Sequence, residues 1–265
     1  FQADQPNETW QLDYSHWYLN NNQRVAILTI IDDHSRYVIA CTAVEHETGT
    51  NVIDTFISAG NKHGFPKSTL TDNGSVFTTK LYRKADTRNG FEQLLLQMGI
   101  HQKNGTPYHP QTQGKIERFH QTLKKWINAR PPAKTVAELQ TLLNEFRDYY
   151  NTTRPHKALG RRTPHQAYTT GTKAKPAHNP TQEWRTRIDV VWDNGKTTVR
   201  YAGKIFHLGI GRKWKRQKIL MVIADNHVIT SLAETGEVIT EHYIDTSRNY
   251  QKPYWKQGDP PLGPE

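Results

Sequence analysis

The sequence predicts an α/β domain built on a mixed sheet, followed by a small all-β barrel. Three observations support this prediction. Up to about residue 150, β-rich runs alternate with stretches whose apolar residues recur every three or four positions. A Thr-, Lys- and Pro-rich stretch without periodicity then interrupts the chain at 169–184. After it, six short β-rich runs are separated by Gly- and Asn-containing turns, which is typical of a small barrel.

These observations divide the chain into four parts. We expect the α/β core over 1–168, a basic linker over 169–184 and the small barrel over 185–246. A Pro- and Gly-rich tail, expected to be disordered, covers 247–265. Of these parts, the barrel is the one expected to bind DNA.

The first three strands of the core are expected at 10–14, 24–31 and 37–44, in an antiparallel meander. Asp13 lies within the first of these runs. Aspartate is a poor strand former, so its presence there invites a functional explanation. Asp32 and Asp33 follow the second run, and in this turn we expect them to hydrogen-bond with backbone groups rather than to act chemically.

The next elements lead to a second acidic residue. A helical stripe over 52–57 is followed by a short strand at 68–71, which runs into Asp72 and the turn Asn73-Gly74. Open α/β sheets carry their chemistry at the carboxyl ends of strands. Taken alone, however, the Asp-Asn-Gly sequence is explained by turn formation. A polar, basic insertion at 82–90, a short helix at 91–98 and an edge strand at 100–103 follow.

The stretch 107–126 begins as a Pro- and Gly-containing loop and becomes a helix. An apolar stripe runs along this helix at intervals of three and four residues. A second face carries the polar residues Glu117, His120, Gln121 and Lys124. A carboxylate among amide, imidazole and ammonium groups suits a metal-binding acid beside a phosphate backbone. An ordinary solvated helix face explains the same residues equally well.

Composition favours an anionic partner. The 265 residues carry 35 Lys and Arg against 25 Asp and Glu, which gives a net charge of +10 and a pI near 9.6. This excess points to nucleic acid first and to an acidic membrane surface second. No apolar run approaches membrane-spanning length and no signal peptide opens the chain, so we expect no membrane partner and a cytoplasmic, nucleoid-associated protein. Cys41 is the only cysteine, which excludes an intrachain disulfide and a cysteine-based zinc site.

The positive charge is concentrated in the second half of the chain. Between residues 151 and 220 there are 16 Lys and Arg but only 3 Asp and Glu. The densest group surrounds Trp214 and consists of Arg212, Lys213, Lys215 and Arg216. A solvated basic loop would look the same, but the excess spans several elements, which favours contact with DNA.

The three acids are more informative together than each is alone. Asp13 on the first strand, Asp72 after the fourth and Glu117 on a later helix can converge at one edge of a mixed sheet. Carboxylate oxygens are the ligands that Mg²⁺ and Mn²⁺ prefer. Two such ions can activate the attacking oxygen and stabilise the leaving oxygen in an in-line phosphoryl transfer.

At these positions the chain resembles the catalytic core of bacterial insertion-sequence transposases, which is of the retroviral-integrase (DDE) type within the ribonuclease-H-like superfamily. The resembling segments are 10–13, 31–36, 71–74 and 109–118, and the segment 150–159 followed by Thr163-Pro164 is similar to the transposase branch. The resemblance covers roughly residues 9–168 and is most specific around Glu117. It implies a ribonuclease-H-like fold for the core.

The resemblance also implies a chemistry. Asp13, Asp72 and Glu117 would be the catalytic residues and would bind two Mg²⁺ or Mn²⁺ ions, with Asp13 contacting both. The implied reaction frees a 3′-hydroxyl at a transposon end, which then attacks target DNA. The partners would be double-stranded transposon ends and target DNA, bound by a homo-oligomer. Helix positions that would face DNA are Gln113, His120, Gln121 and Lys124.

Two features depart from the family pattern. Asp72 and Glu117 are separated by 44 residues, more than is usual in the family, and we expect the surplus to form a longer loop at 82–90. The helix-turn-helix modules that usually precede such a core are not found, so we expect a fragment or a separate reading frame. Two other functions stay open: a non-catalytic DNA-binding protein that keeps the fold, and a ribonuclease-H-like nuclease that cuts RNA–DNA hybrids.

Overall fold

The computed structural model describes residues 2–79, 88–105, 114–177 and 184–259. The chain forms two compact units. The first, the α/β unit, comprises residues 1–47, 58–72 and 95–179, and the second, the β unit, comprises 48–57, 73–94 and 180–265. The division passes through helices α1 (Gly49–His63) and α2 (Gly90–Gln97). Each unit is described by itself.

The α/β unit is built on a five-stranded mixed sheet with the order β3-β2-β1-β4-β5. Its strands are β1 (Thr9–Tyr18), β2 (Arg24–Asp32), β3 (Val38–Val44), β4 (Ser68–Thr71) and β5 (His101–Asn104). The first three strands form an antiparallel meander, and β4 and β5 continue it in parallel with β1. The predicted mixed α/β sheet is confirmed, including the antiparallel meander.

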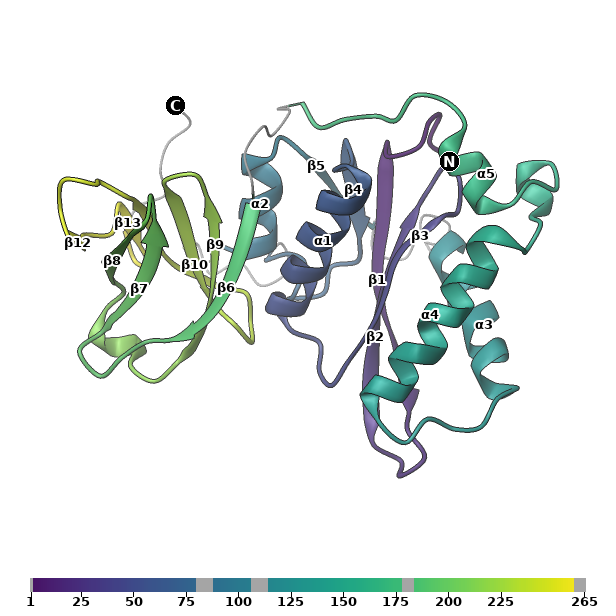
Figure 1. Ribbon diagram of the computed structural model, residues 1–265, viewed down its shortest axis with the longest axis horizontal. Helices are drawn as coiled ribbons and strands as arrows, with labels where there is room; N and C mark the ends of the chain where they lie inside the picture. The colour runs from purple at the N-terminus through teal and green to yellow at the C-terminus, as the bar shows by residue number, and fades with distance from the viewer. Residues whose placement is uncertain (1, 80–87, 106–113, 178–183, 260–265) are drawn as a thin grey trace. The chain divides into compact units, whose positions relative to one another are not determined.

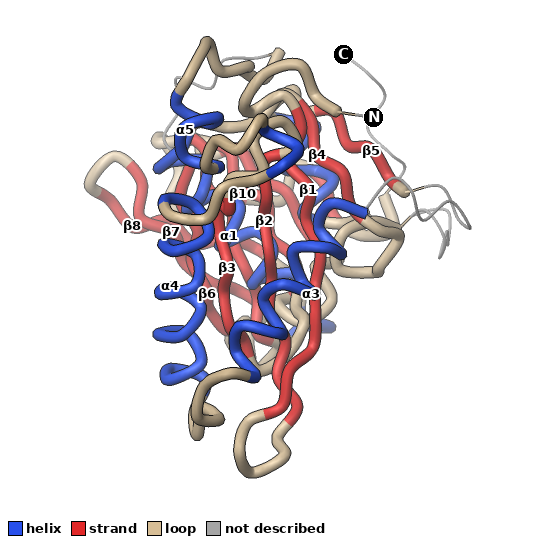
Figure 2. Tube along the Cα trace, turned by 90° about the vertical axis from the view of Figure 1, so that its right-hand side faces the viewer, coloured by secondary structure: helices blue, strands red, loops and turns tan. Residues whose placement is uncertain are grey.

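Two long helices, α3 (Gly114–Asn128) and α4 (Val136–Thr152), lie side by side over one face of the sheet (Figures 1 and 2). β2 is buried along almost its whole length because its residues are apolar on both faces. The stripe of α3 packs with α4 and the sheet into one core, in which Ile116, Phe119, Leu123 and Phe146 are all at most 1% exposed. Cys41 belongs to this core as a buried thiol.

α4 also covers the free edge of β3. The side-chain amide of Asn151 accepts a hydrogen bond from Val38 N (2.8 Å) and donates one to Val38 O (3.1 Å). Gln140 makes the same pair of bonds with Ala43 N (2.8 Å) and Cys41 O (3.0 Å). These amides satisfy backbone groups that an edge strand leaves unpaired, so α4 is fixed in register with the sheet.

The β unit contains two sheets and not the closed barrel that the sequence predicted. Its larger sheet has the order β13-β11-β10-β9-β6, and its smaller sheet has the order β12-β8-β7. The strands are β6 (Trp184–Val190), β7 (Lys196–Tyr201), β8 (Lys204–Gly209), β9 (Lys218–Ala224), β10 (His227–Leu232), β11 (Val238–Tyr243), β12 (Tyr250–Gln251) and β13 (Trp255–Lys256).

The turn at 193–195 explains the difference. The chain leaves the larger sheet after β6 and begins the smaller one at β7, so β6 pairs with β9 whereas β7 pairs with β8. Gly195 has φ +76°, and a Cβ there would meet the backbone N of Arg212 at 2.6 Å. The two sheets enclose one core that includes Val199 and Phe206 from the smaller sheet and Met221 and Ile239 from the larger.

The tail expected to be disordered over 247–265 instead contributes β12 and β13 within its described part. Trp255 is 2% exposed and pairs with Glu241 of β11, while Tyr250 pairs with His207 of β8. Burial of one large aromatic side chain stabilises this segment although its composition is rich in Pro and Gly.

The expected linker over 169–184 begins at the last residue of α5 (Pro164–Thr169). Its described part packs with the α/β unit through backbone hydrogen bonds. Ala174 N bonds to Pro6 O (2.8 Å), and Ala177 N bonds to Gly99 O (3.2 Å). The expected loop insertion at 82–90 lies largely outside the described residues. Within the described ranges, no helix combines the length and apolarity needed to cross a membrane.

Candidate active site

Asp13 lies near the middle of β1, the central strand of the sheet. It pairs with Thr29 of β2, and its side chain is 19% exposed. The antiparallel ladder with β2 extends through Asp13 and fixes its backbone position, and the ladder with β4 pairs β1 up to Gln11. Asp13 therefore sits on rigid structure rather than on a loop.

Asp72 directly follows β4, which runs parallel to β1. The ladder ends at the pair of Gln11 and Leu70, two residues before Asp13 on one strand and Asp72 on the other, and the charge of Asp72 raises the pKa of Asp13. Adjacent strands are about 4.8 Å apart, and Asp72 is exposed. The strand end that the sequence singled out thus lies beside Asp13.

Glu117 comes from α3, which packs on the sheet through Ile116, Phe119 and Leu123. The Glu117 side chain is exposed and lies in the first turn of the helix. α3 contacts β1, the strand that carries Asp13. A helix and two strands therefore supply the three acids.

The charges of these acids act on one another. Burial, and then the negative charges of Asp72, Glu117 and Glu47, raise the pKa of Asp13 to about 7, while a hydrogen bond from the backbone N–H of Tyr14 opposes the shift. The Asp13 carboxyl thus lies near three other negative charges. Among the described residues, however, no three His, Cys, Asp or Glu side chains lie close enough to hold a metal ion as they stand.

His120 lies behind Asp13 and not on the DNA-facing surface that the sequence predicted for it. It is 8% exposed, its Nε2 is 3.2 Å from Thr29 Oγ1, and its Nδ1 is 3.7 Å from Asp13 Oδ2. Burial, and then the charge of Lys124, lowers the pKa of His120 to about 4. The imidazole is therefore neutral near pH 7 and does not balance the charge of Asp13. Its spacing of four residues from Ile116 already matched the apolar stripe.

The other predicted DNA contacts stay predictions. Gln121 is exposed and Lys124 is half-buried on α3, while Gln113 lies outside the described residues. The four basic residues around Trp214 are all exposed. Two of them have partners: Arg216 Nε lies 2.9 Å from Asp193 Oδ1, and Lys213 Nζ bonds to Gln257 Oε1 (3.3 Å).

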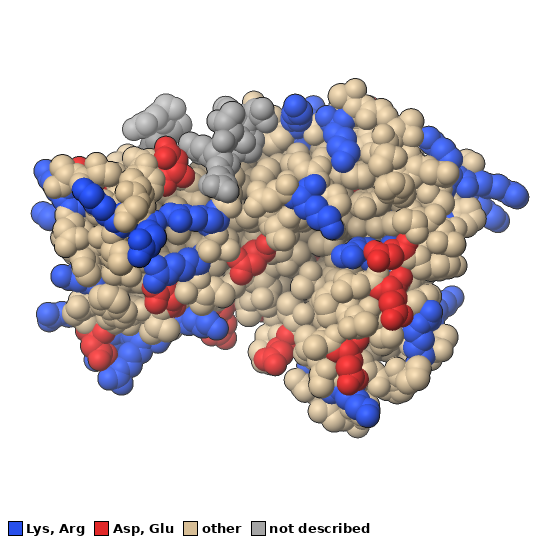
Figure 3. Space-filling view, in the orientation of Figure 1, with Lys and Arg blue, Asp and Glu red and all other residues tan. Residues whose placement is uncertain are grey.

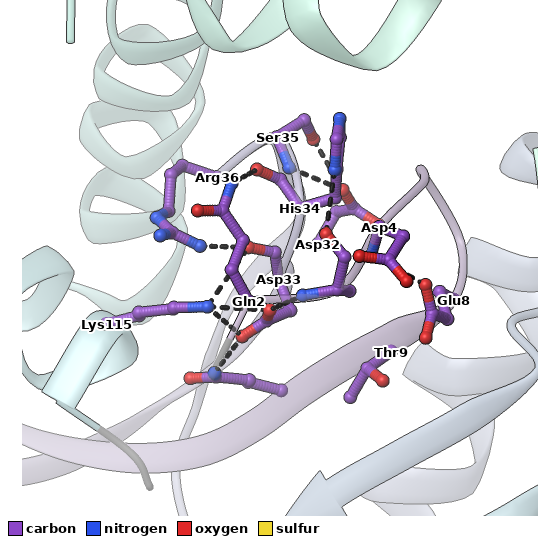
Figure 4. Close-up of polar contacts among 12 residues, drawn as sticks. Gln2, Asp4, Glu8, Thr9, Asp32, Asp33, His34, Ser35, Arg36 and Lys115 are labelled. Atoms are coloured by element: carbon purple, nitrogen blue, oxygen red, sulfur yellow. Dashed lines mark hydrogen bonds and ion pairs between the residues drawn. The ribbon is translucent and has the colours of Figure 1, made fainter. Parts of the chain in front are cut away.

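Sequence reasoning missed a polar network that holds the start of α3. Lys115 Nζ lies 2.7 and 2.6 Å from the two carboxylate oxygens of Asp33 (Figure 4). Asp33 also accepts hydrogen bonds from Ala3 N (2.7 Å) and Gln11 Nε2 (2.6 Å). The structural role predicted for Asp33 is confirmed, and its pair with Lys115 fixes the helix two residues before Glu117.

Asp32, the other acid of this turn, is also fully satisfied. Its carboxylate accepts bonds from Asn7 N (2.7 Å), Ser35 N (2.8 Å) and Ser35 Oγ (2.6 Å). Burial raises its pKa, and these hydrogen bonds oppose the shift. The turn role predicted for Asp32 is confirmed as well.

The donor set at Asp13 fits a hard divalent cation. It consists of carboxylates alone, and oxygen is the ligand that Mg²⁺ and Mn²⁺ prefer. Burial and, after it, repulsion from the neighbouring acids raise the pKa of Asp13, and a bound cation would relieve the repulsion. Asp13, Asp72 and Glu117 are the residues that would hold it.

Comparisons with known proteins match the α/β unit. Residues 3–110 match the family model described as integrase core domain, and residues 98–164 match a second model with the same description. An uncharacterized 39.2 kDa protein of insertion element IS476 from Xanthomonas euvesicatoria is 29% identical over 165 residues, which cover 62% of this chain and 45% of the relative. The Gag-Pro-Pol polyprotein of squirrel monkey retrovirus is 36% identical over 129 residues, or 48% of this chain and 6% of the polyprotein.

A solved structure extends the likeness to the fold of most of the chain. It is the cryoEM structure of the simian T-cell lymphotropic virus intasome in complex with PP2A regulatory subunit B56 gamma. It is 18% identical with a TM-score of 0.54, covering 90% of this chain and 80% of that one. This chain spans less than half the length of the two curated relatives described above.

Proposed function

We propose, from the integrase core domain that this chain carries over residues 3–164, that the protein is a DNA transposase that processes 3′ ends and transfers DNA strands. The reaction would take place at Asp13, Asp72 and Glu117. The observation that carries the proposal is the unbalanced negative charge at Asp13, whose pKa is raised to about 7 by burial and by the neighbouring acids. Structural acids of the same unit are neutralised by hydrogen bonds and Lys115.

The residues of this site would act by holding divalent cations and the scissile phosphate in place. Bound Mg²⁺ or Mn²⁺, which we expect as two ions, supplies Lewis-acid activation of the attacking and leaving oxygens. Asp13 is fixed by the backbone ladder between β1 and β2, and His120 Nδ1 lies 3.7 Å from its Oδ2. Glu117 is carried by a helix whose start is tied to Asp33 through Lys115. Such preorganisation keeps the ligand oxygens in position.

The nucleophile in this proposal is external. A water molecule would attack the phosphodiester in end processing, and a DNA 3′-hydroxyl would attack it in strand transfer. In each step one P–O bond forms and another breaks at the same phosphorus. No covalent protein–DNA intermediate is required, so no serine, cysteine or tyrosine nucleophile is needed beside the acids.

The β unit would bind the DNA backbone. Lys and Arg are spread over its surface, with Asp and Glu among them (Figure 3). Within this unit, residues 180–220 carry 10 Lys and Arg against 3 Asp and Glu, which supports this role. Joining two DNA ends needs two active sites, so we expect the protein to act as a homo-oligomer.

Asp72→Asn is the direct test, because Asp72 is exposed and its substitution leaves the core untouched. We expect Mn²⁺-dependent joining of a labelled duplex to plasmid DNA to fall at least about a thousandfold, while DNA binding survives. Asp148→Asn makes the same change at an exposed position of α4 and is the matched control. Full joining activity in Asp72→Asn, or equal losses in both variants, would overturn the proposal.

A further inference from the structure

A cavity of about 630 Å³ opens in the α/β unit beside the start of α3. It is lined on one side by α3 and on the other by the end of α4 and the segment after it. That segment belongs to 150–159, whose sequence resembled the transposase branch but received no role. The proposed active site does not use this cavity.

The lining is strongly cationic. It includes five Lys and Arg side chains, and no described acidic residue lines it. The basic residues are Arg36, Lys115, Arg118, Arg154 and Lys157. Arg36 and Lys115 are held by the backbone oxygen and the carboxylate of Asp33, respectively (Figure 4). The other three side chains make no ion pair within the part of the chain that the structure describes.

One buried polar atom in the lining lacks a partner. The Nε2 atom of His156 is buried and has no hydrogen bond within the described residues. Its ring meets that of Tyr150, which is 6% exposed, edge to face with centroids 4.7 Å apart. Buried polar groups are rarely left unpaired without a reason, and this one borders a cavity lined by five basic side chains.

The protonation states suit hydrogen-bond donation to an anion. Burial raises the pKa of Tyr150 to about 12, so its hydroxyl keeps its proton. Burial, together with Arg154 and Arg36, lowers the pKa of His156 to about 4, so its ring is neutral. Gly114, the first residue of α3, also lines the cavity, and the start of a long helix favours phosphate.

We propose that this cavity binds a backbone phosphate of the DNA strand that enters the active site. Arg118, Arg154 and Lys157 supply the charge, and the Tyr150 hydroxyl donates a hydrogen bond. The proposal rests on the proposed function, because it names a further contact for the same substrate.

Position favours a DNA strand over a free anion. Lys115 and Arg118 flank Glu117 on α3, so the cavity and the acid share one helix. The other side of the cavity is linked to Asp33, which binds Lys115. Its neighbour Asp32 pairs with Trp10, and Trp10 lies three residues before Asp13 on β1. Three strand residues span about 10 Å, so the cavity and Asp13 are separated along β1 by about the length of three nucleotides of a DNA strand. A strand anchored here would therefore continue past the acidic edge.

The test compares two double variants of the full chain on a duplex oligonucleotide. Arg154→Gln with Lys157→Gln removes two charges from the cavity. Arg24→Gln with Lys134→Gln removes one Arg and one Lys at the opposite end of the sheet, where both are exposed. DNA affinity is measured as a function of salt concentration, because each phosphate contact contributes about one to the slope of log affinity against log salt.

We expect the cavity variant to lose affinity about tenfold or more and to have a slope lower by one to two, while the control keeps the wild-type slope. Equal slopes for the two variants would overturn the phosphate contact. Joining activity that disappears in Asp72→Asn would still support the proposed function in that case, so the two failures are distinguishable.

A single-atom change gives a second readout. Tyr150→Phe removes only the hydroxyl that the proposal places on the phosphate, and Tyr149→Phe removes the hydroxyl of an exposed neighbouring residue. We expect Tyr150→Phe alone to weaken DNA binding, by about threefold, with unchanged unfolding. An unchanged affinity would contradict the hydroxyl contact. Calorimetric binding of inorganic phosphate that Arg154→Gln with Lys157→Gln abolishes, without any change in DNA affinity, would assign the cavity to a free anion and overturn the DNA anchor.

Discussion

Two groups of acidic residues lie in the α/β unit, and they differ in how their charge is balanced. Asp32 and Asp33 at the end of β2 receive backbone N–H groups, a serine hydroxyl, an amide and the ammonium of Lys115. Asp13, in the middle of β1, has the neutral His120 at 3.7 Å and two further carboxylates nearby. Burial raises the pKa of both Asp32 and Asp13, but only at Asp13 do other acids add to the shift.

The difference separates a structural role from a catalytic one. A buried carboxylate that is fully hydrogen-bonded stabilises the fold, and its removal leaves donors unsatisfied. A carboxylate that is repelled by its neighbours costs stability and persists where a bound cation offsets the repulsion. In sequence both groups are aspartates at or near strands, so charge balance is the property that distinguishes them.

The largest expected effect is on activity, from Asp13→Asn. We expect the rate of strand transfer to fall at least about a thousandfold, or about 4 kcal/mol. The melting temperature measured in chelator should stay the same or rise, because the substitution removes a charge that Asp72 and Glu117 repel. A large drop in melting temperature would mean that Asp13 stabilises the fold as Asp32 and Asp33 do, and would contradict the distinction between the two groups.

The next effect is on stability, from Asp32→Asn. One of the two carboxylate oxygens would become an amide NH₂ that faces existing donors, either Asn7 N or the two donors of Ser35. We expect a loss of about 3 kcal/mol in the free energy of unfolding, measured with urea. Asp4→Asn, at an exposed position, controls for the chemical change. A stability close to that of wild type would show that the hydrogen bonds of Asp32 do not stabilise the fold.

A smaller effect is expected in the β unit, where a buried imidazole stays neutral instead of having its charge balanced. His242 is fully buried and bonds to Gly209 O (3.1 Å), and burial lowers its pKa to about 4. Its pKa in the unfolded chain is about 6.5. Below pH 6.5 the unfolded form therefore takes up a proton that the folded form does not, and stability falls as the pH drops toward 4.

His242→Gln should remove this contribution. Between pH 7.5 and pH 5.5, wild type should lose about 1 kcal/mol more than the variant in urea unfolding of the β unit. Above about pH 7.5, where the unfolded imidazole is neutral as well, the difference between the two proteins should be constant. Parallel losses over the whole range would mean that His242 titrates normally in the folded protein.

The sequence predicted most of the elements because their signals are local. The run of apolar residues in β2 and the stripe of α3 each identify an element without knowledge of its partners. The three acids were found because each sits beside a recognisable strand or helix. In contrast, the pairing of Lys115 with Asp33 joins residues 82 positions apart and has no sequence pattern.

Other features depend on tertiary packing in the same way. Turn spacing in the β unit indicates short strands, but it does not say which strands pair, so two sheets were taken for one barrel. The cavity beside Tyr150 appears only when the segment after α4 meets the start of α3. His120 shows the opposite case, because its spacing from Ile116 and Leu123 indicated burial while its polar character suggested the surface.

The central claim is that Asp13, Asp72 and Glu117 bind a divalent cation. The most direct test is a crystal of the protein soaked in MnCl₂ and measured for anomalous scattering from manganese. The account predicts a peak bounded by Asp13 and Asp72, with Glu117 turned toward it, and no peak at Asp32 or Asp33. Ordered carboxylates at Asp13 and Asp72 without manganese between them would contradict it.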